Sequence, residues 1–295
     1  MKAQNVCIPC ILDDLAGAAR NLDLSPEMSR QVLREALGFL AQKFDGSQTP
    51  AFYITGVHRI LKRVSGIPVP FAEARARANQ AGVKLADKVR AELKSLPAEK
   101  RGQRYLRLAI AGNELDFRTV GTGYGVTDTA LELRLREAAA QPLAVDESGN
   151  IYQAARRAKN ILFIHDNVGE IALDRLLIEE LGETGAKVVS ALRGGPITSD
   201  ATVQDGKRVG LDQVARVIEA GPDTLGISFE EMSPALRKAL AEADMIFSKG
   251  QANYYVLSEH RREIPAPIAY LLRTKCDLVA AEFGLKGKVS IAALR

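Results

Sequence analysis

The sequence contains no tryptophan and only three cysteines and three histidines in 295 residues. The cysteines, Cys7, Cys10 and Cys276, cannot all pair with one another, which argues against the disulfide framework of a small secreted protein. Three histidines provide no H-E-x-x-H zinc helix, and no Ser-His-Asp arrangement can be read from so few candidates. These absences exclude several common classes of hydrolase.

Long apolar runs are also missing. No stretch approaches the roughly 18 apolar residues that a membrane-crossing helix needs. The acidic pair Asp13 and Asp14 interrupts the N-terminal apolar segment before it could act as a signal peptide. We therefore expect a cytoplasmic protein with no membrane partner.

The charge balance is nearly even, with 40 lysines and arginines against 36 aspartates and glutamates, a net charge of +4. No basic run is interleaved with aromatic residues, so nucleic acid is not an expected partner. A modest positive excess suits an anionic small molecule. The hydrophobic fraction of 46% is that of an ordinary globular protein. Nothing in the sequence fixes the oligomeric state.

Spacing of apolar residues divides the chain near residue 104. Residues 7–104 show apolar positions at three- and four-residue intervals, which predicts a helical N-terminal region over residues 1–104. Residues 105–295 contain short apolar stretches separated by helical segments, which predicts an α/β domain with a mostly parallel sheet. Its four expected core strands are Ile161–Ile164, Val188–Leu192, Met245–Phe247 and Ile268–Leu272.

The stretch from Asn160 to Leu181 reads as a buried strand, a polar turn and an amphipathic helix. Asp166 and Asn167 lie at the turn, and ligands of open parallel sheets collect at the carboxyl ends of strands. A second interpretation is that Asn167 caps the helix together with Glu170. Capping leaves Asp166 unexplained, because a buried carboxylate needs a cation or a donor.

Two later strands end in similar polar clusters. Asp200 and Asp205 follow one strand, and Lys249 and Asn253 follow another. Oxygen ligands from Asp166, Asn167 and Asp200 suit a hard cation such as Mg²⁺ or Mn²⁺.

The pair Lys249-Gly250 suits an oxyanion, since lysine supplies charge and glycine lets backbone N–H groups approach closely. The alternative for Lys249 is a solvated lysine after a strand. Together the strand ends indicate a metal and phosphate centre.

The glycine-rich GTGYG at residues 121–125 lacks the spacing of a nucleotide-binding loop, so we interpret it as an ordinary flexible loop. Cys7 and Cys10 form a C-x-x-C pair that could bind a metal together with Cys276 and, as a distant fourth ligand, His58. A redox role and plain burial of the thiols are alternatives.

The segments FIHDNVGE, GGPITSDATVQD and ADMIFSKGQANYYVL occur in this order. They closely resemble the metal-dependent damage-control phosphatases, which were long catalogued as a domain of unknown function and are related to acidic-residue methyltransferase-like proteins. The resemblance covers most of the chain, with CIPCIL, HRILKRVSG, AIAGNELDF and RTKCDLVA as further matches. The cysteines look like those of the microbial subgroup of the family.

This resemblance implies a helical region packed on a three-layer α/β/α domain and a divalent metal (Mg²⁺, Mn²⁺, Co²⁺ or Ni²⁺) on Asp166, Asn167 and Asp200. It also implies a phosphate held near Lys249 and a substrate pocket. Lys249 and Asn253, with neighbouring backbone, are implied for the phosphate, and Asn113 and Asp116 for the border of the pocket. Our further candidates for substrate binding are Glu170, Asp205, Ser248 and Gly250. The chain departs from the family pattern at Ser199, often asparagine, and at Ala252, usually glycine.

These observations predict metal-assisted hydrolysis of a small phosphomonoester, such as a sugar phosphate or a damaged phosphorylated metabolite. Asp166, Asp200 and Lys249 are the expected catalytic residues. The attacking group stays open, because Asp166 could be a nucleophile or only a ligand and Asp205 could be a base for water. Glu170 could orient a water or cap its helix. The rival functions are a sugar-phosphate or nucleotide transferase and a non-enzymatic sensor that binds a phosphorylated ligand.

Overall fold

The structure, a computed structural model, describes residues 1–116 and 128–295. The GTGYG segment lies outside these residues, so its interpretation as a loop remains a prediction. Within the described ranges, no helix is both long enough and apolar enough to span a membrane.

In this part of the chain seven strands form one sheet in the order β1-β7-β6-β5-β2-β3-β4, and every neighbouring pair is parallel except β6 and β7. The strands are β1 (Val145–Asp146), β2 (Asn160–Ile164), β3 (Lys187–Leu192), β4 (Arg216–Glu219), β5 (Met245–Lys249), β6 (Ile268–Arg273) and β7 (Ser290–Leu294). The four predicted core strands are confirmed as β2, β3, β5 and β6. The prediction missed β1, β4 and β7, which lie toward the two edges of the sheet.

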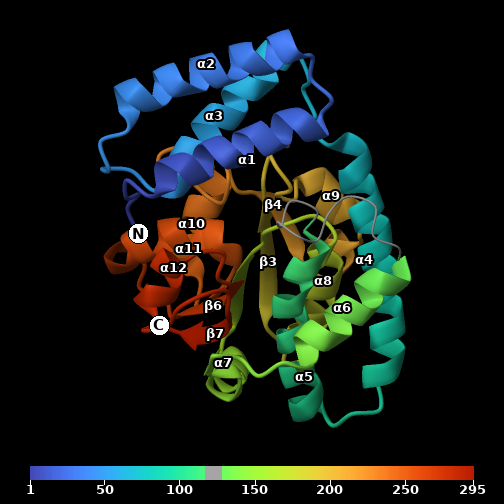
Figure 1. Cartoon of the computed structure of the whole chain (residues 1–295). Coiled ribbons are helices and arrows are strands. Elements are labelled where there is room, and N and C mark those ends of the chain that lie inside the picture. The colour runs from blue at the N-terminus through green and yellow to red at the C-terminus, as the bar shows by residue number, and fades with distance from the viewer. Residues whose placement is uncertain (117–127) are drawn as a thin grey trace.

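Helices cover both faces of the sheet (Figure 1). The helices of the chain are α1 (Cys7–Asn21), α2 (Pro26–Lys43), α3 (Pro50–Ser65), α4 (Ala72–Leu93), α5 (Ala98–Ala111), α6 (Asp128–Ala140), α7 (Ser148–Ala155), α8 (Glu170–Gly182), α9 (Val203–Arg208), α10 (Pro234–Glu242), α11 (Gly250–Glu259) and α12 (Asp277–Glu282). Short 3₁₀ helices cover Gly112–Leu115, Leu211–Gln213 and Arg261–Glu263.

Alternate strand residues enter two separate cores, because successive side chains of a strand point to opposite faces. Phe163 and Phe247 pack into a core with α4 to α8. Leu162 and Ile246 pack into the other core with α10, α11 and α12. The mostly parallel, three-layer α/β/α arrangement expected from the sequence is confirmed.

A third core belongs to the N-terminal helices α1, α2 and α3 and includes Ile11, Leu15, Val32, Tyr53 and Leu61. Figure 1 shows this bundle lying across one end of the sheet. Helices α4 and α5 instead contribute to the core on one face of the sheet. The division predicted at residue 104 falls inside α5, and as a division of domains it remains a prediction.

Helix α4 packs backbone against backbone on the turn that follows β2. A Cβ atom on Gly82 would lie 2.2 Å from the carbonyl oxygen of Gly169. Gly169 itself has a φ of +83°, and a Cβ there would lie 2.9 Å from the carbonyl oxygen of Ala78. Two glycines thus let α4 approach the segment that carries Asp166 and Asn167.

We predict that Gly82→Ala lowers the free energy of unfolding by about 1–3 kcal/mol, because the added methyl group must push α4 away from the turn. The matched control is Gly38→Ala in α2, where a Cβ meets nothing within 4 Å. That control should be neutral or stabilising by up to about 1 kcal/mol, the helix preference of alanine over glycine. Denaturant unfolding measures both, and equal effects of the two changes would contradict the close contact.

Candidate functional site

A cavity of about 260 Å³ lies where the strands end, as expected for an open parallel sheet. Its floor is made by residues that follow four strands: Asp166 and Asn167 after β2, Thr198, Ser199 and Asp200 after β3, Gln251 after β5, and Thr274 and Lys275 after β6. Helix α1 of the N-terminal bundle adds Cys10, Asp13 and Asp14. The cavity therefore lies between the α/β domain and the bundle.

Asp166 and Asn167 occupy the turn between β2 and α8, and both are at least 95% buried. The side-chain amide of Asn167 donates to Asp166 Oδ2 at 2.9 Å, and its oxygen accepts from Ser199 Oγ at 2.7 Å. Gly169 precedes α8 and no side chain caps that helix, so the capping interpretation of Asn167 is wrong. Burial, and then the charges of Glu170 and Asp200, raise the pKa of Asp166 well above its usual value.

Asp200 is held against this turn by backbone and side-chain bonds. The backbone N–H of Ala201 donates to the carbonyl oxygen of Asp166 at 2.7 Å. Asp200 Oδ2 accepts from the fully buried Arg193 and from the N–H of Gly226, and Oδ1 accepts from Thr198 Oγ1. The site thus has two carboxylates and one amide fixed side by side.

Gly250, the first residue of α11, lies directly against Asp166. A Cβ at position 250 would fall 1.8 Å from Asp166 Oδ2, and Gly250 has a φ of +74°. Glycine is therefore required here for conformation and for space. The prediction placed Gly250 at the anion site, and the structure places it beside the carboxylate of Asp166.

Lys249 does not line the cavity. Its side chain is 2% exposed, and its Nζ donates to Asp174 Oδ1 at 2.7 Å and to Glu170 Oε1 at 3.0 Å. Burial opposes the charge, but the carboxylates of Asp174 and Glu170 outweigh it and raise the pKa of Lys249. Asp174 also contacts His165 Nδ1 at 2.9 Å. Lys249 is therefore the centre of a buried ion-pair network behind the cavity.

Glu170, Ser248 and Asn253 are buried in the same layer behind the cavity. Asn253 donates to the carbonyl oxygens of His165 and Lys249 and accepts from the N–H of Ile227, so its amide is fully engaged in joining backbone segments. Ser248 Oγ and Glu170 Oε2 are buried and have no hydrogen-bond partner among the described residues.

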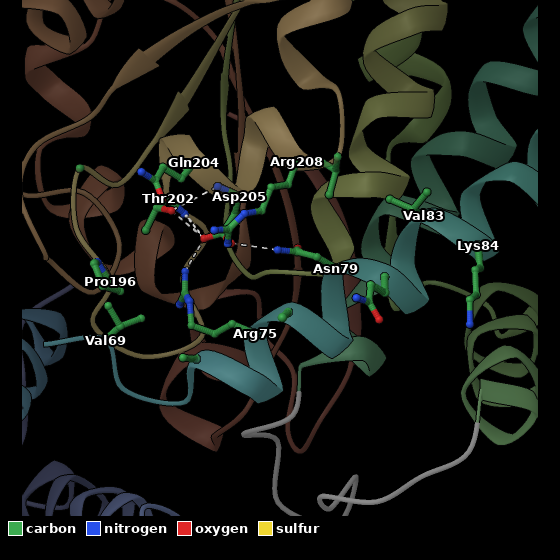
Figure 2. Close-up of a pocket in the computed structure, with 15 residues that line it drawn as sticks. Val69, Arg75, Asn79, Val83, Lys84, Pro196, Thr202, Gln204, Asp205 and Arg208 are labelled. Carbon is green, nitrogen blue, oxygen red and sulfur yellow. Dashed lines mark hydrogen bonds and ion pairs between the residues drawn. The ribbon is translucent and has the colours of Figure 1, made fainter. Parts of the chain in front are cut away.

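Asp205 lies on the other side of the Asp200 loop, away from the cavity. Its oxygens accept from Arg75, Asn79 and the backbone and hydroxyl of Thr202, which forms a capping box at the start of α9. Figure 2 shows Arg75 and Asn79 directed at Asp205. Burial opposes ionisation, but Arg75 and Thr202 outweigh it and lower the pKa of Asp205. Asp205 does not line the cavity, so it is not placed to act as a general base there.

Lys275 is the cationic residue of the site that our sequence analysis missed. Its Nζ donates to Asp116 Oδ2 at 2.9 Å, and its positive charge acts to lower the pKa of Asp166. Arg273 also lines the cavity and pairs with Glu114. Both follow the predicted strand Ile268–Leu272, so the same strand-end rule could have found them. Asn113 and Asp116 line the cavity as the resemblance implied.

The residues around Asp166 fit a hard divalent cation. Among the described residues, no group of three or more histidine, cysteine, aspartate or glutamate side chains is arranged for a metal ion. The set here is two carboxylates and an amide, and Mg²⁺ commonly takes few protein oxygens and keeps several waters. Rotating the side-chain amide of Asn167 by half a turn would exchange its nitrogen and oxygen and place the oxygen beside the carboxylate of Asp166. Ser199 permits this exchange, because its hydroxyl can accept from the amide nitrogen as well as donate to the amide oxygen.

The cysteines lie at the edge of the same cavity and remain free thiols. Cys10 and Cys276 line it, whereas Cys7 is buried and accepts a weak hydrogen bond from the N–H of Gln4. His58, the proposed distant ligand, contacts Asp14 through Nε2 at 2.8 Å. Burial and the charge of Asp14 raise the pKa of Cys10, which disfavours the reactive thiolate.

Comparison with known proteins gives one consistent result. Residues 3–289 match the family model described as the damage-control phosphatase ARMT1-like domain. The chain is 32% identical over 283 residues to the damage-control phosphatase PH1575 of Pyrococcus horikoshii, covering 96% of this chain and 94% of that protein. It is 29% identical over 286 residues to a damage-control phosphatase of Archaeoglobus fulgidus, covering 97% and 96%.

A solved structure of a DUF89 family protein from P. horikoshii superposes with a TM-score of 0.87 and 30% sequence identity. The superposition covers 99% of this chain and 98% of that one. The arrangement of bundle, sheet and helices is therefore shared over the whole length.

We predict that Lys249→Met lowers the free energy of unfolding by about 3–5 kcal/mol, because it leaves two buried carboxylates without their cation. The matched control is Lys238→Met on α10, where the lysine is 70% exposed and pairs with Glu242 at 3.7 Å. The control should change stability by less than about 1 kcal/mol. Denaturant unfolding at neutral pH gives both values. A solvent-facing Lys249 would instead give two similar, small effects.

Proposed function

This chain belongs to the damage-control phosphatase ARMT1-like domain family, and we propose that it is a divalent-metal-dependent phosphatase for small phosphomonoesters. The observation that carries the proposal is the cluster at the strand ends: two carboxylates and an amide lie in one cavity with Lys275. A site of this composition pairs a cation position with a positive charge for phosphate. The cavity of about 260 Å³ suits a small metabolite.

Asp166, Asn167 and Asp200 would hold the cation. The raised pKa of Asp166 supports this assignment, because a nearby cation would relieve the repulsion from Glu170 and Asp200. When bound, Mg²⁺, Mn²⁺, Co²⁺ or Ni²⁺ would act as a Lewis acid on the phosphoryl oxygens.

Lys275, rather than Lys249, would bind the phosphate and offset its charge during transfer. Its side chain lines the cavity and is 40% exposed, whereas the side chain of Lys249 is 2% exposed and lies behind the cavity. Asn113 and Asp116 would border the substrate from the other wall. The buried network around Lys249 would fix β5 and α8, the two elements that flank Asp166.

The reaction is hydrolysis, in which a water oxygen forms a new bond to phosphorus and the ester P–O bond breaks. The products are inorganic phosphate and an alcohol that leaves with a proton. Asp205 is not part of this step, because it lies outside the cavity and both its oxygens are engaged.

The first test is phosphate release from sugar phosphates and an aryl phosphate by chelator-stripped protein, with each of the four metals added. We predict metal-dependent release that falls at least about 100-fold in Asp166→Asn, which keeps the shape but removes the charge that holds the cation. The variant should remain folded, because it also removes a buried charge. Release that is equal in both proteins would refute the assignment of Asp166. A complete absence of release with retained metal binding would favour a transferase or a sensor.

A second prediction separates the two lysines. Lys275→Met should lower kcat/KM by about 100- to 1,000-fold, the usual effect of removing one donor to a developing oxyanion. The control is Lys286→Met, which is an exposed neighbour outside the cavity. Steady-state kinetics on the best substrate, with melting temperature recorded for both variants, makes the comparison. Unchanged kcat/KM in Lys275→Met would remove this lysine from the site.

A further inference from the structure

A second and larger cavity, of about 960 Å³, lies between α4 and α9 on the far side of the Asp200 loop (Figure 2). It shares no lining residue with the cavity around Asp166. Its volume falls at the upper end of the range for sites that bind organic small molecules. Of the residues that the sequence analysis assigned to metal or substrate, this cavity is lined only by Asp205, which does not line the cavity around Asp166.

The walls and rim of the cavity differ in chemistry. Apolar side chains form much of the wall, among them Val69, Val83, Pro196 and Val209. Polar groups converge at one end, where Gln204 and Arg208 of α9 lie beside the pair of Arg75 and Asp205. An apolar wall with a few convergent polar groups is the usual composition of a small-molecule site.

The polar end carries a positive excess. Two cationic side chains, Arg75 and Arg208, lie there against the single carboxylate of Asp205. That carboxylate is already neutralised by Arg75 at 2.5 Å. Arg208 is 64% exposed, and its ion pair to Asp205 measures 3.6 Å, which is too long for a good hydrogen bond. Its planar fork of donors is therefore available to an anion.

The floor of this cavity is connected to the loop that carries Asp200. Arg75 donates to the carbonyl oxygens of Thr198 and Asp200, each at 2.8 Å, and to the carboxylate of Asp205. Asn79 joins Asp205 to the N–H of Gly169 in the turn after Asn167. A ligand that draws Arg208 away from Asp205 would leave Arg75 as the main cationic partner of that carboxylate. Because Arg75 also holds the carbonyl oxygens of Thr198 and Asp200, such a change would be transmitted to the loop.

We propose that this cavity is an accessory site for an organic anion with an apolar body, and that its occupancy is transmitted to the Asp200 loop through Arg75. The ligand would place its anionic group on Arg208 and its apolar body against Val69, Val83 and Val209. The inference is independent of the phosphatase reaction, because it concerns binding and loop dynamics in the metal-free protein.

Binding is tested with anilinonaphthalene sulfonate, a fluorescent anion with an apolar body, titrated into the intact protein. We expect one saturable site, and Arg208→Glu should weaken binding by about tenfold or more through the reversed charge. Lys207→Glu makes the same charge change one residue away, outside the cavity, and should weaken it by less than about twofold. Ala76→Trp, which fills the cavity from α4, should abolish saturable binding. Equal affinities in wild type, Arg208→Glu and Ala76→Trp would overturn the site.

Transmission is tested by hydrogen–deuterium exchange of peptides covering residues 196–206, with and without saturating dye and without metal. We expect slower exchange in this segment when the dye is bound, and no change in Arg208→Glu at the same dye concentration. Exchange that stays the same in wild type, despite saturation, would overturn the link to the Asp200 loop. Neither experiment uses phosphate release, so failure here is distinct from failure of the proposed phosphatase activity.

Discussion

The ion-pair network around Lys249 is the constraint on which the site depends. Lys249 ends β5, and its ammonium is shared by Glu170 and Asp174, which lie on the first two turns of α8. Strand β5, which pairs with β2, and helix α8, which follows the turn at Asp166, are thereby joined in a buried layer. Such a network stabilises only when every partner is present, because any single loss leaves an uncompensated buried charge. The carboxylates of the cavity are thus supported from behind by buried charges that do not line the cavity.

Most of the sheet could be predicted from the sequence, because buried parallel strands read as continuous apolar runs. That pattern gave β2, β3, β5 and β6 with small errors at their ends. The remaining strands were missed for a physical reason: β1 has only two residues, and β4 carries charged residues at both ends. Strand β7 is buried on both faces, but two of its three buried residues, Ala292 and Ala293, are alanines, which give a weak apolar signal.

The site was only partly predictable. The rule that ligands bind at the carboxyl ends of parallel strands correctly grouped Asp166, Asn167 and Asp200. The rule does not tell whether a lysine at the end of a strand points into the cavity or toward a helix. Successive residues of a strand point to opposite faces, so an error of one residue in the strand's register reverses the predicted direction. Lys249 points toward α8. Lys275 follows the predicted strand Ile268–Leu272, so the same rule could have identified it. The structural role of Asp205 could have been predicted, since Thr202 and Asp205 have the spacing of a helix capping box.

The close approach of Gly250 and Asp166 has a consequence for which side chains the two positions can carry together. The carboxylate of Asp166 occupies the space where any other residue at position 250 would carry its Cβ atom. Neither position can accept a larger side chain while its neighbour stays as it is. Shortening residue 166 would remove only the steric half of this constraint, because the φ of +74° at position 250 would still favour glycine.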